Sequence, residues 1–317
     1  MARIDVNGLF DFRFNVLPSF VSTPVTFATS AVSSTNLESL TINYTDASRQ
    51  NVSSFTIREL SNNATVTVSG LNLDHSLVEN YLISGRYQSL LRVADAGNDT
   101  VAAGSASVNL VGGAGNDYLV MGSNGRADGG TGLNTLEIQR GFVTNIVQTG
   151  DAAFTITSSS GGSIVNTVQA TDIQRIKIGQ SVTAFDIDGN AGQVFRLYQA
   201  ALGRTPDQVG LSVQVNAVDH GLSLNGLANN FLGSSEFALK YGANPSNEAF
   251  VTSLYFNVLR RAPDAGGFAA YTNALNAGAL DKATALVQFS ESQENHINVD
   301  PVIAVGVQLD ATYLQLV

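Results

Sequence analysis

The stretch Gly112-Gly113-Ala114-Gly115-Asn116-Asp117-Tyr118-Leu119-Val120 decides the fold of the middle of this chain. It fits the nine-residue pattern G-G-x-G-x-D-x-U-x, in which U is a large apolar residue. Glycines let the backbone turn tightly and bring its carbonyl oxygens close to an ion. Asp117 supplies the hard anionic oxygen that calcium prefers. Leu119 is expected in a very short strand, with its side chain pointing into a core.

The flanking residues decide how much weight this motif carries, because Gly-Asn-Asp is also ordinary turn chemistry. Eighteen residues upstream, the segment 94–102 has glycine, asparagine, aspartate and an apolar residue in register. Downstream, 121–128 is one residue short and matches poorly. The segment 129–137 then restores the pattern, with Asn134 in the aspartate position. The sequence therefore predicts a short array of stacked turns.

These repeats resemble the haemolysin-type calcium-binding repeats of RTX proteins. The resemblance implies a β-roll in which one coil is two nonapeptides, so turns eighteen residues apart stack on the same edge. Asp99 and Asp117 would then share a calcium ion, and Asp117 with Asn134 would form a second, weaker site. The expected metal-site residues are Asp99, Asp117, Gly97, Gly113, Gly115, Asn116 and Asn134. A Gly-Asp-rich turn in an ordinary β-domain is the other interpretation.

Length and composition set broad limits on the class of protein. The chain has 317 residues, of which 44% are hydrophobic and 13% charged, so two or three domains with real cores are expected. The net charge of −10 and the scattered Lys and Arg residues argue against nucleic-acid binding. Cysteine is absent, which excludes disulfides and thiolate metal sites. No apolar run is long enough to predict a membrane span.

We predict an α+β multidomain chain. Alternating apolar residues in 1–93 predict an N-terminal β domain, with strands beginning near Leu37, Phe55 and Thr65. Phe10, Phe12 and Phe14 predict a further strand. The roll with a β cap is expected at 94–180, including a hairpin around Ser160-Gly161-Gly162. Helical periodicity follows over 184–299, and 300–317 forms a tail.

The helical part is a tandem duplication. Leu197-Tyr198 and Leu254-Tyr255 lie 57 residues apart, as do Arg204 to Asp207 and Arg261 to Asp264. Two units, about 194–250 and 251–299, are therefore predicted. Thr205 is expected to cap the helix that follows Pro206, with Gln208 three residues on.

The repeated words Leu-Tyr-x-x-x-Leu-x-Arg-x-Pro-Asp and Phe-x-x-Ser-x-Glu resemble a helical domain of unknown function found near the C-terminal end of many bacterial RTX and surface proteins. The resemblance covers about Ala184 to Val299. It implies export by type I secretion machinery and an extracellular or cell-surface location. The last residues, from Leu309 to Val317, resemble the uncleaved signal of such proteins, an acid followed by apolar residues.

No catalytic motif was found in the sequence. There is no H-E-x-x-H zinc helix, no G-x-S-x-G elbow and no G-x-x-x-x-G-K loop. A pair of carboxylates could still act on a glycosidic bond; the candidates in the helical units are Glu236, Glu248, Glu291 and Glu294. The histidines are His75, His220 and His296, and His220 is expected at a helix end.

Asp186 and Asp188 precede Gly189 and begin like a calcium loop. The closing glutamate is missing, because position twelve counted from Asp186 is Leu197. A hinge or helix cap is the favoured interpretation, and a further calcium site is the alternative.

Together these features predict a secreted, calcium-binding, non-enzymatic structural or adhesive cell-surface protein. Strand edges that could recruit other chains predict a homo-oligomer or a lattice, such as a surface layer or matrix. A surface polysaccharide is a candidate partner. Two alternatives stay open: a secreted carbohydrate-binding or accessory module, and an exopolysaccharide-acting enzyme with an unrecognised pair of acids.

Overall fold

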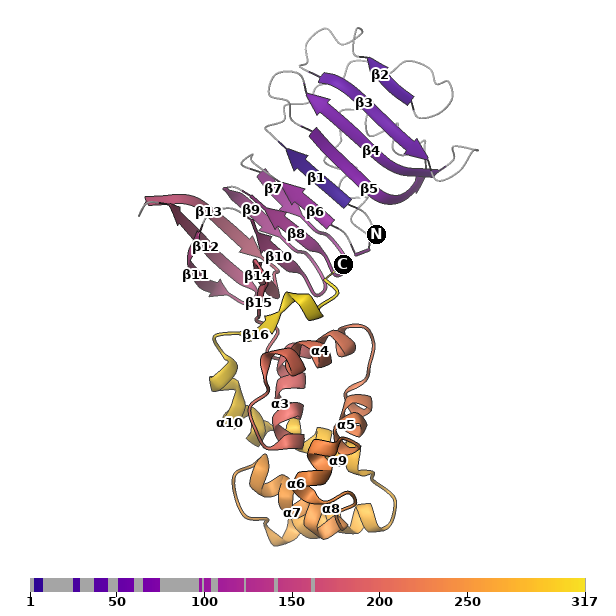
Figure 1. Cartoon of the computed structure of the whole chain (residues 1–317), viewed down its shortest axis with the longest axis vertical. Helices are drawn as coiled ribbons and strands as arrows, with labels where there is room; N and C mark the ends of the chain where they lie inside the picture. Colours follow the sequence, from indigo (N-terminus) through magenta and orange to yellow (C-terminus); the bar gives the residue numbers. More distant parts are fainter. Residues whose placement is uncertain are drawn as a thin grey trace. The chain divides into compact units, whose positions relative to one another are not determined.

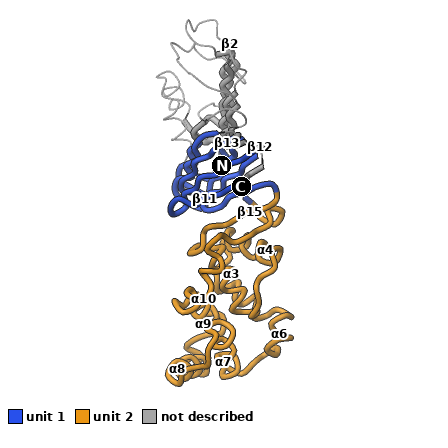
Figure 2. The backbone as a smooth tube through the Cα atoms, turned by 90° about the vertical axis from the view of Figure 1, so that its left-hand side faces the viewer, with its two compact units in different colours: residues 1–179, 316–317 blue, residues 180–315 orange. Residues whose placement is uncertain are grey.

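The structure is a computed structural model. It describes residues 97–98, 100–103, 108–122, 124–139, 142–160 and 163–316, together with the backbone of five strands between Arg3 and Asp74. The chain divides into two compact units, 1–179 with 316–317, and 180–315 (Figure 2). Strands make up the described part of the first unit, and helices dominate the second (Figure 1). The α+β class is therefore confirmed.

The first unit begins with an antiparallel group of strands. In spatial order these are β2 (Val25–Ala28), β3 (Leu37–Tyr44), β4 (Asn51–Glu59), β5 (Thr65–Asp74) and β1 (Arg3–Asn7). β3, β4 and β5 occupy the segments in which alternation predicted strands. The predicted strand at Phe10, Phe12 and Phe14 lies outside the described residues.

Four short strands continue the sheet in parallel. They are β6 (Thr100–Ala103), β8 (Tyr118–Met121), β10 (Thr135–Ile138) and β14 (Arg175–Ile178). β1 pairs antiparallel with β5 and parallel with β6, so both of its edges are used. Segments 1–93 and 94–180, predicted as separate domains, therefore share one sheet and fall in one compact unit.

A second sheet of the same unit contains the intervening strands. β7 (Val108–Val111), β9 (Gly125–Asp128) and β13 (Ser163–Thr171) are parallel, and successive strands from β6 to β10 alternate between the two sheets (Figure 1). β11 (Phe142–Gly150) and β12 (Ala153–Ser160) extend this sheet in antiparallel fashion. The predicted hairpin is the β12–β13 pair.

One row of apolar side chains forms the core of the parallel strands. Val101, Leu119, Leu136 and Ile176 are cross-strand partners in register, and each is buried. The apolar U position of the nine-residue pattern thus becomes a ladder that crosses four strands, and its burial drives the stacking.

The second unit contains two copies of the same four-helix sequence. The first copy is α3 (Asn190–Leu202), α4 (Gln208–Asp219), α5 (Leu224–Leu232) and α6 (Ser235–Tyr241). The second copy is α7 (Asn247–Asn257), α8 (Ala265–Asn276), α9 (Lys282–Ser290) and α10 (Gln293–Ile303). The first residues of α3 and α7 lie 57 apart, and those of α5 and α9 lie 58 apart. The extra residue lies in the loop between α8 and α9.

Side-chain caps set the starts of these helices. Asp207 accepts a hydrogen bond from the backbone N–H of Gly210, and Asp264 does the same for Gly267. The prediction of Thr205 as the cap was wrong by two residues: Asp207 is the residue with extended dihedrals whose side-chain oxygen reaches the first-turn N–H groups. His220 is the C-terminal cap of α4, as predicted.

The segment predicted as a tail belongs to the second unit as far as Gln315. α10 continues to Ile303, and β16 (Val307–Asp310) pairs antiparallel with β15 (Ser181–Ala184). A 3-10 turn, η1 (Ala311–Tyr313), follows, and Leu309 and Leu314 are buried. Among the described residues, no helix has the length and apolar character needed to cross a membrane.

Candidate functional site

The glycine turns stack by backbone hydrogen bonds between turns one coil apart. Gly97 donates to the carbonyl of Ala114 at 2.7 Å, and Gly115 donates to that of Thr131 at 2.9 Å. Thr131 in turn donates to Gly113 at 2.8 Å. Three turns, around 97–98, 112–117 and 129–134, therefore form one continuous stack.

Glycine is required in this stack because the turns lie in contact through their backbones. A Cβ on Gly115, where φ is +137°, would lie 2.2 Å from the carbonyl oxygen of Gly97. A Cβ on Gly132, where φ is +123°, would lie 2.0 Å from that of Gly115. Both positions combine a positive φ with a close approach, so each has two separate reasons to be glycine.

Asparagines form rungs between successive turns. The side-chain oxygen of Asn98 accepts the N–H of Asn116 at 2.8 Å, and that of Asn116 accepts the N–H of Leu133 at 2.9 Å. Asn134 is fully buried. Its Oδ1 accepts the N–H of Asp117 at 2.9 Å, while its Nδ2 donates to the carbonyls of Gly130 and Asp172.

The two predicted calcium places differ in what their side chains already bond to. Asp117 is buried, and its Oδ2 lies 2.5 Å from where a Cβ on Gly112 would be, so the glycine makes room for the carboxylate. This half of the Asp99–Asp117 site suits a hard cation; Asp99 lies outside the described residues. At the Asp117–Asn134 place the carboxamide of Asn134 bonds to three backbone groups, so this residue already has a structural role there.

Asp186 lies three residues before Gly189, the N-cap residue of α3, and bonds to the first turn of that helix. Its Oδ2 accepts the N–H of Ala191 at 3.0 Å, and its carbonyl accepts the N–H groups of Gly189 and Gly192. The bonds from Ala191 and Gly192 satisfy donors in the first turn of α3, while the N-cap residue itself is Gly189. Asp188, two residues on, is exposed and points elsewhere.

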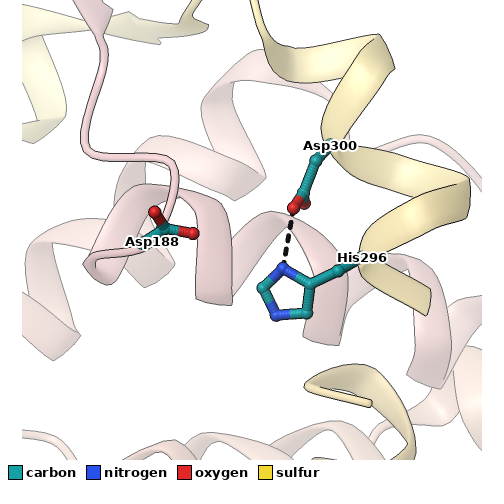
Figure 3. Close-up of side chains that lie close together, drawn as sticks. All are labelled: Asp188, His296 and Asp300. Carbon is teal, nitrogen blue, oxygen red and sulfur yellow. Dashed lines mark hydrogen bonds and ion pairs between the residues drawn. The ribbon is translucent and has the colours of Figure 1, made fainter. Parts of the chain in front are cut away.

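Asp188 instead meets two residues of α10 that sequence reasoning did not connect with it. One ligand atom from each of Asp188, His296 and Asp300 lies within 4.8 Å of the other two (Figure 3). His296 and Asp300 are one helical turn apart, and Nδ1 of His296 lies 2.7 Å from Oδ2 of Asp300. Asp188 reaches the same place from the loop before α3.

A buried arginine fixes the surroundings of this cluster. Arg196 of α3 is 1% exposed and bonds to both oxygens of Glu291, at 2.7 and 3.1 Å. It also bonds to Oδ1 of Asp300 at 3.1 Å and to the carbonyl of Ile187 at 2.9 Å. One guanidinium thus positions the loop that carries Asp188 and the helix that carries Asp300.

The repeated sequence motif forms a different network, which occurs once in each copy. In the first copy Arg204 forms two bonds to Glu236 and one to Asp207, and its guanidinium lies over the ring of Tyr198. Tyr198 also packs edge-on against Phe231, with ring centroids 5.1 Å apart.

The second copy reproduces these contacts. Arg261 bonds to Glu294 and Asp264 and lies over Tyr255, which packs edge-on against Phe289. The Tyr, Arg, Asp, Glu and Phe of the repeated words therefore each have a packing, pairing or capping role. The network explains the motif as the framework of the helical unit.

Little in the sequence points to the Asp188 cluster. A histidine and an aspartate at i and i+4 on one helix are a weak hint of a shared site, and Asp188 lies 108 residues before His296. Only the packing of α10 against α3 brings the three together.

Comparisons with known proteins give one match. A family model described as a domain of unknown function (DUF4214) matches residues 228–299, from within α5 to within α10. The matched segment is thus similar to that family over most of the second helical copy. No curated protein and no solved structure matches the chain.

Proposed function

We propose that this chain is a secreted, calcium-binding, non-enzymatic structural or adhesive protein of the bacterial cell surface. In this proposal the alternating strands β6 to β10 and their glycine turns are a β-roll of the RTX type. The observation that carries it is the buried carboxylate of Asp117 in a turn stack whose glycines leave room for it.

The calcium site is proposed between the turns at 97–99 and 112–117. Asp99 and Asp117 would supply the carboxylates, and backbone carbonyls of the turns would supply neutral oxygens. A carbonyl that accepts one hydrogen bond keeps a second lone pair, so the stacking bonds leave room for a metal contact. When bound, calcium would supply positive charge that offsets two carboxylates on one edge; its role is structural.

A calcium titration of the full chain tests this. The melting temperature should rise in excess calcium relative to chelator, with a stabilisation of about 2.7 kcal/mol at a hundredfold excess over the dissociation constant. Asp117→Asn should remove most of this rise. Asp128→Asn is the matched control, since Asp128 accepts a bond from Gly130 in its own turn and should keep the response. An unchanged melting temperature in wild type would show the proposal to be wrong.

The non-enzymatic part of the proposal rests on what the candidate acids do. Glu236 and Glu294 are bonded to Arg204 and Arg261, and Glu291 is bonded to Arg196. Each is bonded to an arginine in a contact of the framework, which suits solvation and packing better than proton transfer. A turnover screen on exopolysaccharides tests this point, and activity lost in Glu236→Gln or Glu291→Gln would contradict it.

Self-association is the remaining part of the proposal, and β11 supports it. Within the described residues β11 pairs only with β12, it carries no charge or proline, and Val147 on it is 44% exposed. Natural sheets usually blunt such an edge, so β11 is suited to pair with β11 of a second copy. Sedimentation velocity in millimolar calcium should show oligomers, and Val147→Lys should reduce them. A monomer at tens of micromolar would overturn this part.

A further inference from the structure

We propose that Asp188, His296 and Asp300 form a second metal site, which takes a divalent transition-metal ion such as Zn²⁺ and not calcium. The site lies wholly in the helical unit and does not depend on the glycine turns. It uses one nitrogen and two carboxylate ligands, and the remaining positions of the ion would be open to water.

The spacing of the three side chains suits a small ion. A zinc ion about 2.0–2.2 Å from each ligand holds its ligands about 3–4 Å from one another. Nδ1 of His296 and Oδ2 of Asp300 already lie 2.7 Å apart, so an ion can replace the proton between them with a small separation. Asp188 is exposed, and one of its carboxylate oxygens lies within 4.8 Å of the ligand atoms of His296 and Asp300.

The framework around the ligands is fixed in advance. Arg196 holds Oδ1 of Asp300, which leaves Oδ2 to face His296. The loop before Asp188 lies so close to α3 that a Cβ on Gly192 would be 1.8 Å from the carbonyl oxygen of Ile187. Oε2 of Glu291 lies 3.7 Å from Nε2 of His296, at the other ring nitrogen. This distance is longer than a hydrogen bond, so Glu291 contributes negative charge beside the ring.

The local charge favours a cation. Asp188, Glu291 and Asp300 are three carboxylates around the single guanidinium of Arg196, which gives a net charge of −2 with His296 neutral. Within the helical unit no ion pair to Asp188 is found. A divalent ion neutralises this excess at the point where Asp188 and Asp300 face the same imidazole.

The internal duplication separates this cluster from the framework of the fold. Tyr198, Arg204, Asp207 and Glu236 have identical counterparts in the second copy, as expected for residues that every copy needs. The residues of the cluster have none. Their counterparts, at the offsets of 57 and 58, are Pro245 for Asp188, Ser253 for Arg196, Gly233 for Glu291, Ala238 for His296 and Gly242 for Asp300. The second copy thus has no counterpart of Asp188 and Arg196, and the first has none of Glu291, His296 and Asp300, so the cluster is not part of the motif that both copies share.

The ligand types select the class of metal. An imidazole nitrogen suits zinc, copper, iron and nickel, whereas calcium takes oxygen ligands and needs six to eight of them. A site with one nitrogen and two carboxylates is thus a poor calcium site. This separates the inference from the interpretation of Asp188 as part of a calcium loop.

Isothermal titration of the chelator-stripped full chain with ZnCl₂, and separately with CaCl₂, tests the proposal. We expect zinc to bind at this site with at least tenfold higher affinity than calcium. His296→Asn and Asp188→Asn should each weaken zinc binding at least tenfold. His220→Asn is the matched control, because His220 is a helix cap on α4 and should leave zinc binding unchanged.

Asp188→Asn should fold as wild type does, because Asp188 is exposed and forms no ion pair within the helical unit. This variant therefore keeps the test valid if His296→Asn misfolds. Circular dichroism in chelator should match wild type. Zinc binding that survives both His296→Asn and Asp188→Asn would overturn the proposal. So would calcium binding at this site as tightly as zinc, or no zinc binding by the wild-type chain. Zinc binding at this site does not depend on calcium binding at Asp117. A chain that shows no calcium-dependent rise in melting temperature could still bind zinc here, so the two proposals fail separately.

Discussion

Arg196 and Glu291 lie 95 residues apart in the chain and meet through two hydrogen bonds, at 2.7 and 3.1 Å. The guanidinium belongs to the first helix of the first copy, and the carboxylate ends the third helix of the second copy. Because Arg196 is 1% exposed, its charge depends on Glu291 and Asp300 for compensation. This contact joins the two copies of the helical unit.

Arg196→Gln should therefore destabilise the helical unit. The change removes the positive charge that compensates two carboxylates. It also removes three of the hydrogen bonds that join α3 to its neighbours. Since those carboxylates are 21% and 31% exposed, water can take over part of the loss. We expect about 3 kcal/mol less free energy of unfolding. Urea denaturation followed by helical circular dichroism measures it.

Arg260→Gln is the matched control for this prediction, because Arg260 is exposed and forms no ion pair in the helical unit. It should change the free energy of unfolding by less than about 0.5 kcal/mol. Equal effects of the two substitutions would contradict a joining role for Arg196.

Acid should weaken the helical unit through its repeated ion pairs. The hydrogen bonds from Arg204 lower the pKa of Glu236, and those from Arg261 lower the pKa of Glu294, from the ordinary value of 4.5. Because the pKa is lower in the folded state, the stabilisation is present above pH 4.5 and is lost as the pH falls through the folded pKa. The side chains of both pairs are about 40% exposed, so water screens them. We therefore expect the Arg204–Glu236 pair to contribute less than about 1 kcal/mol to the free energy of unfolding.

The double substitution Glu236→Gln with Glu294→Gln should flatten the dependence of stability on pH between about 5 and 3. Melting temperatures across this range provide the measurement. Asp151→Asn, at an exposed turn of the first unit, should leave the slope as in wild type. A slope unchanged by the double substitution would show that other carboxyls carry the acid response.

Sequence periodicity predicted the elements whose signal is local. The apolar position that became Leu119 and Leu136 predicted stacked short strands, and the 57-residue repeat predicted the paired helices. Asn134 shows the limit of this reasoning. Its place in the pattern predicted a weak metal ligand, and the pattern did not predict that its carboxamide also bonds to the backbones of Asp117, Gly130 and Asp172. An amide can donate and accept, a carboxylate only accepts, and the sequence pattern does not say which the buried site needs.

The same limit applies to the sites. Asp186 and Asp188 are neighbours in sequence, yet one bonds to the first turn of α3 and the other faces α10. That difference depends on how α10 packs against α3, which no local pattern encodes. Likewise, the sharing of β1 between β5 and β6 depends on pairing over long sequence separations.

Gly132→Ala should disrupt the turn stack. The new Cβ would lie 2.0 Å from the carbonyl oxygen of Gly115, so the turns must separate, and φ of +123° is also strained. We expect a loss of more than about 3 kcal/mol in the first unit. Thermal unfolding followed by strand circular dichroism measures it.

Gly278→Ala separates the two causes of this loss. Gly278 has a φ of +67° but nothing within 4 Å of its Cβ position, so it carries only the backbone strain, about 1 kcal/mol. If both substitutions cost the same, the close approach of the turns does not matter to stability.

Ser212→Ala should loosen β16 from α4. Ser212 is fully buried; its hydroxyl accepts the N–H of Asp310 at 2.8 Å and donates to the carbonyl of Gln208 at 2.6 Å. Alanine leaves the Asp310 N–H without this acceptor, which costs about 1–2 kcal/mol. The second copy has Ala269 at the matching position of α8, which fits a role specific to this strand. Hydrogen exchange should speed up at Val307 to Asp310 while α8 keeps its protection. Ser253→Ala, which removes only a bond within α7, is the control and should leave exchange in β16 unchanged. Equal exchange at β16 in the Ser212 variant and wild type would show that pairing with β15 alone holds the strand.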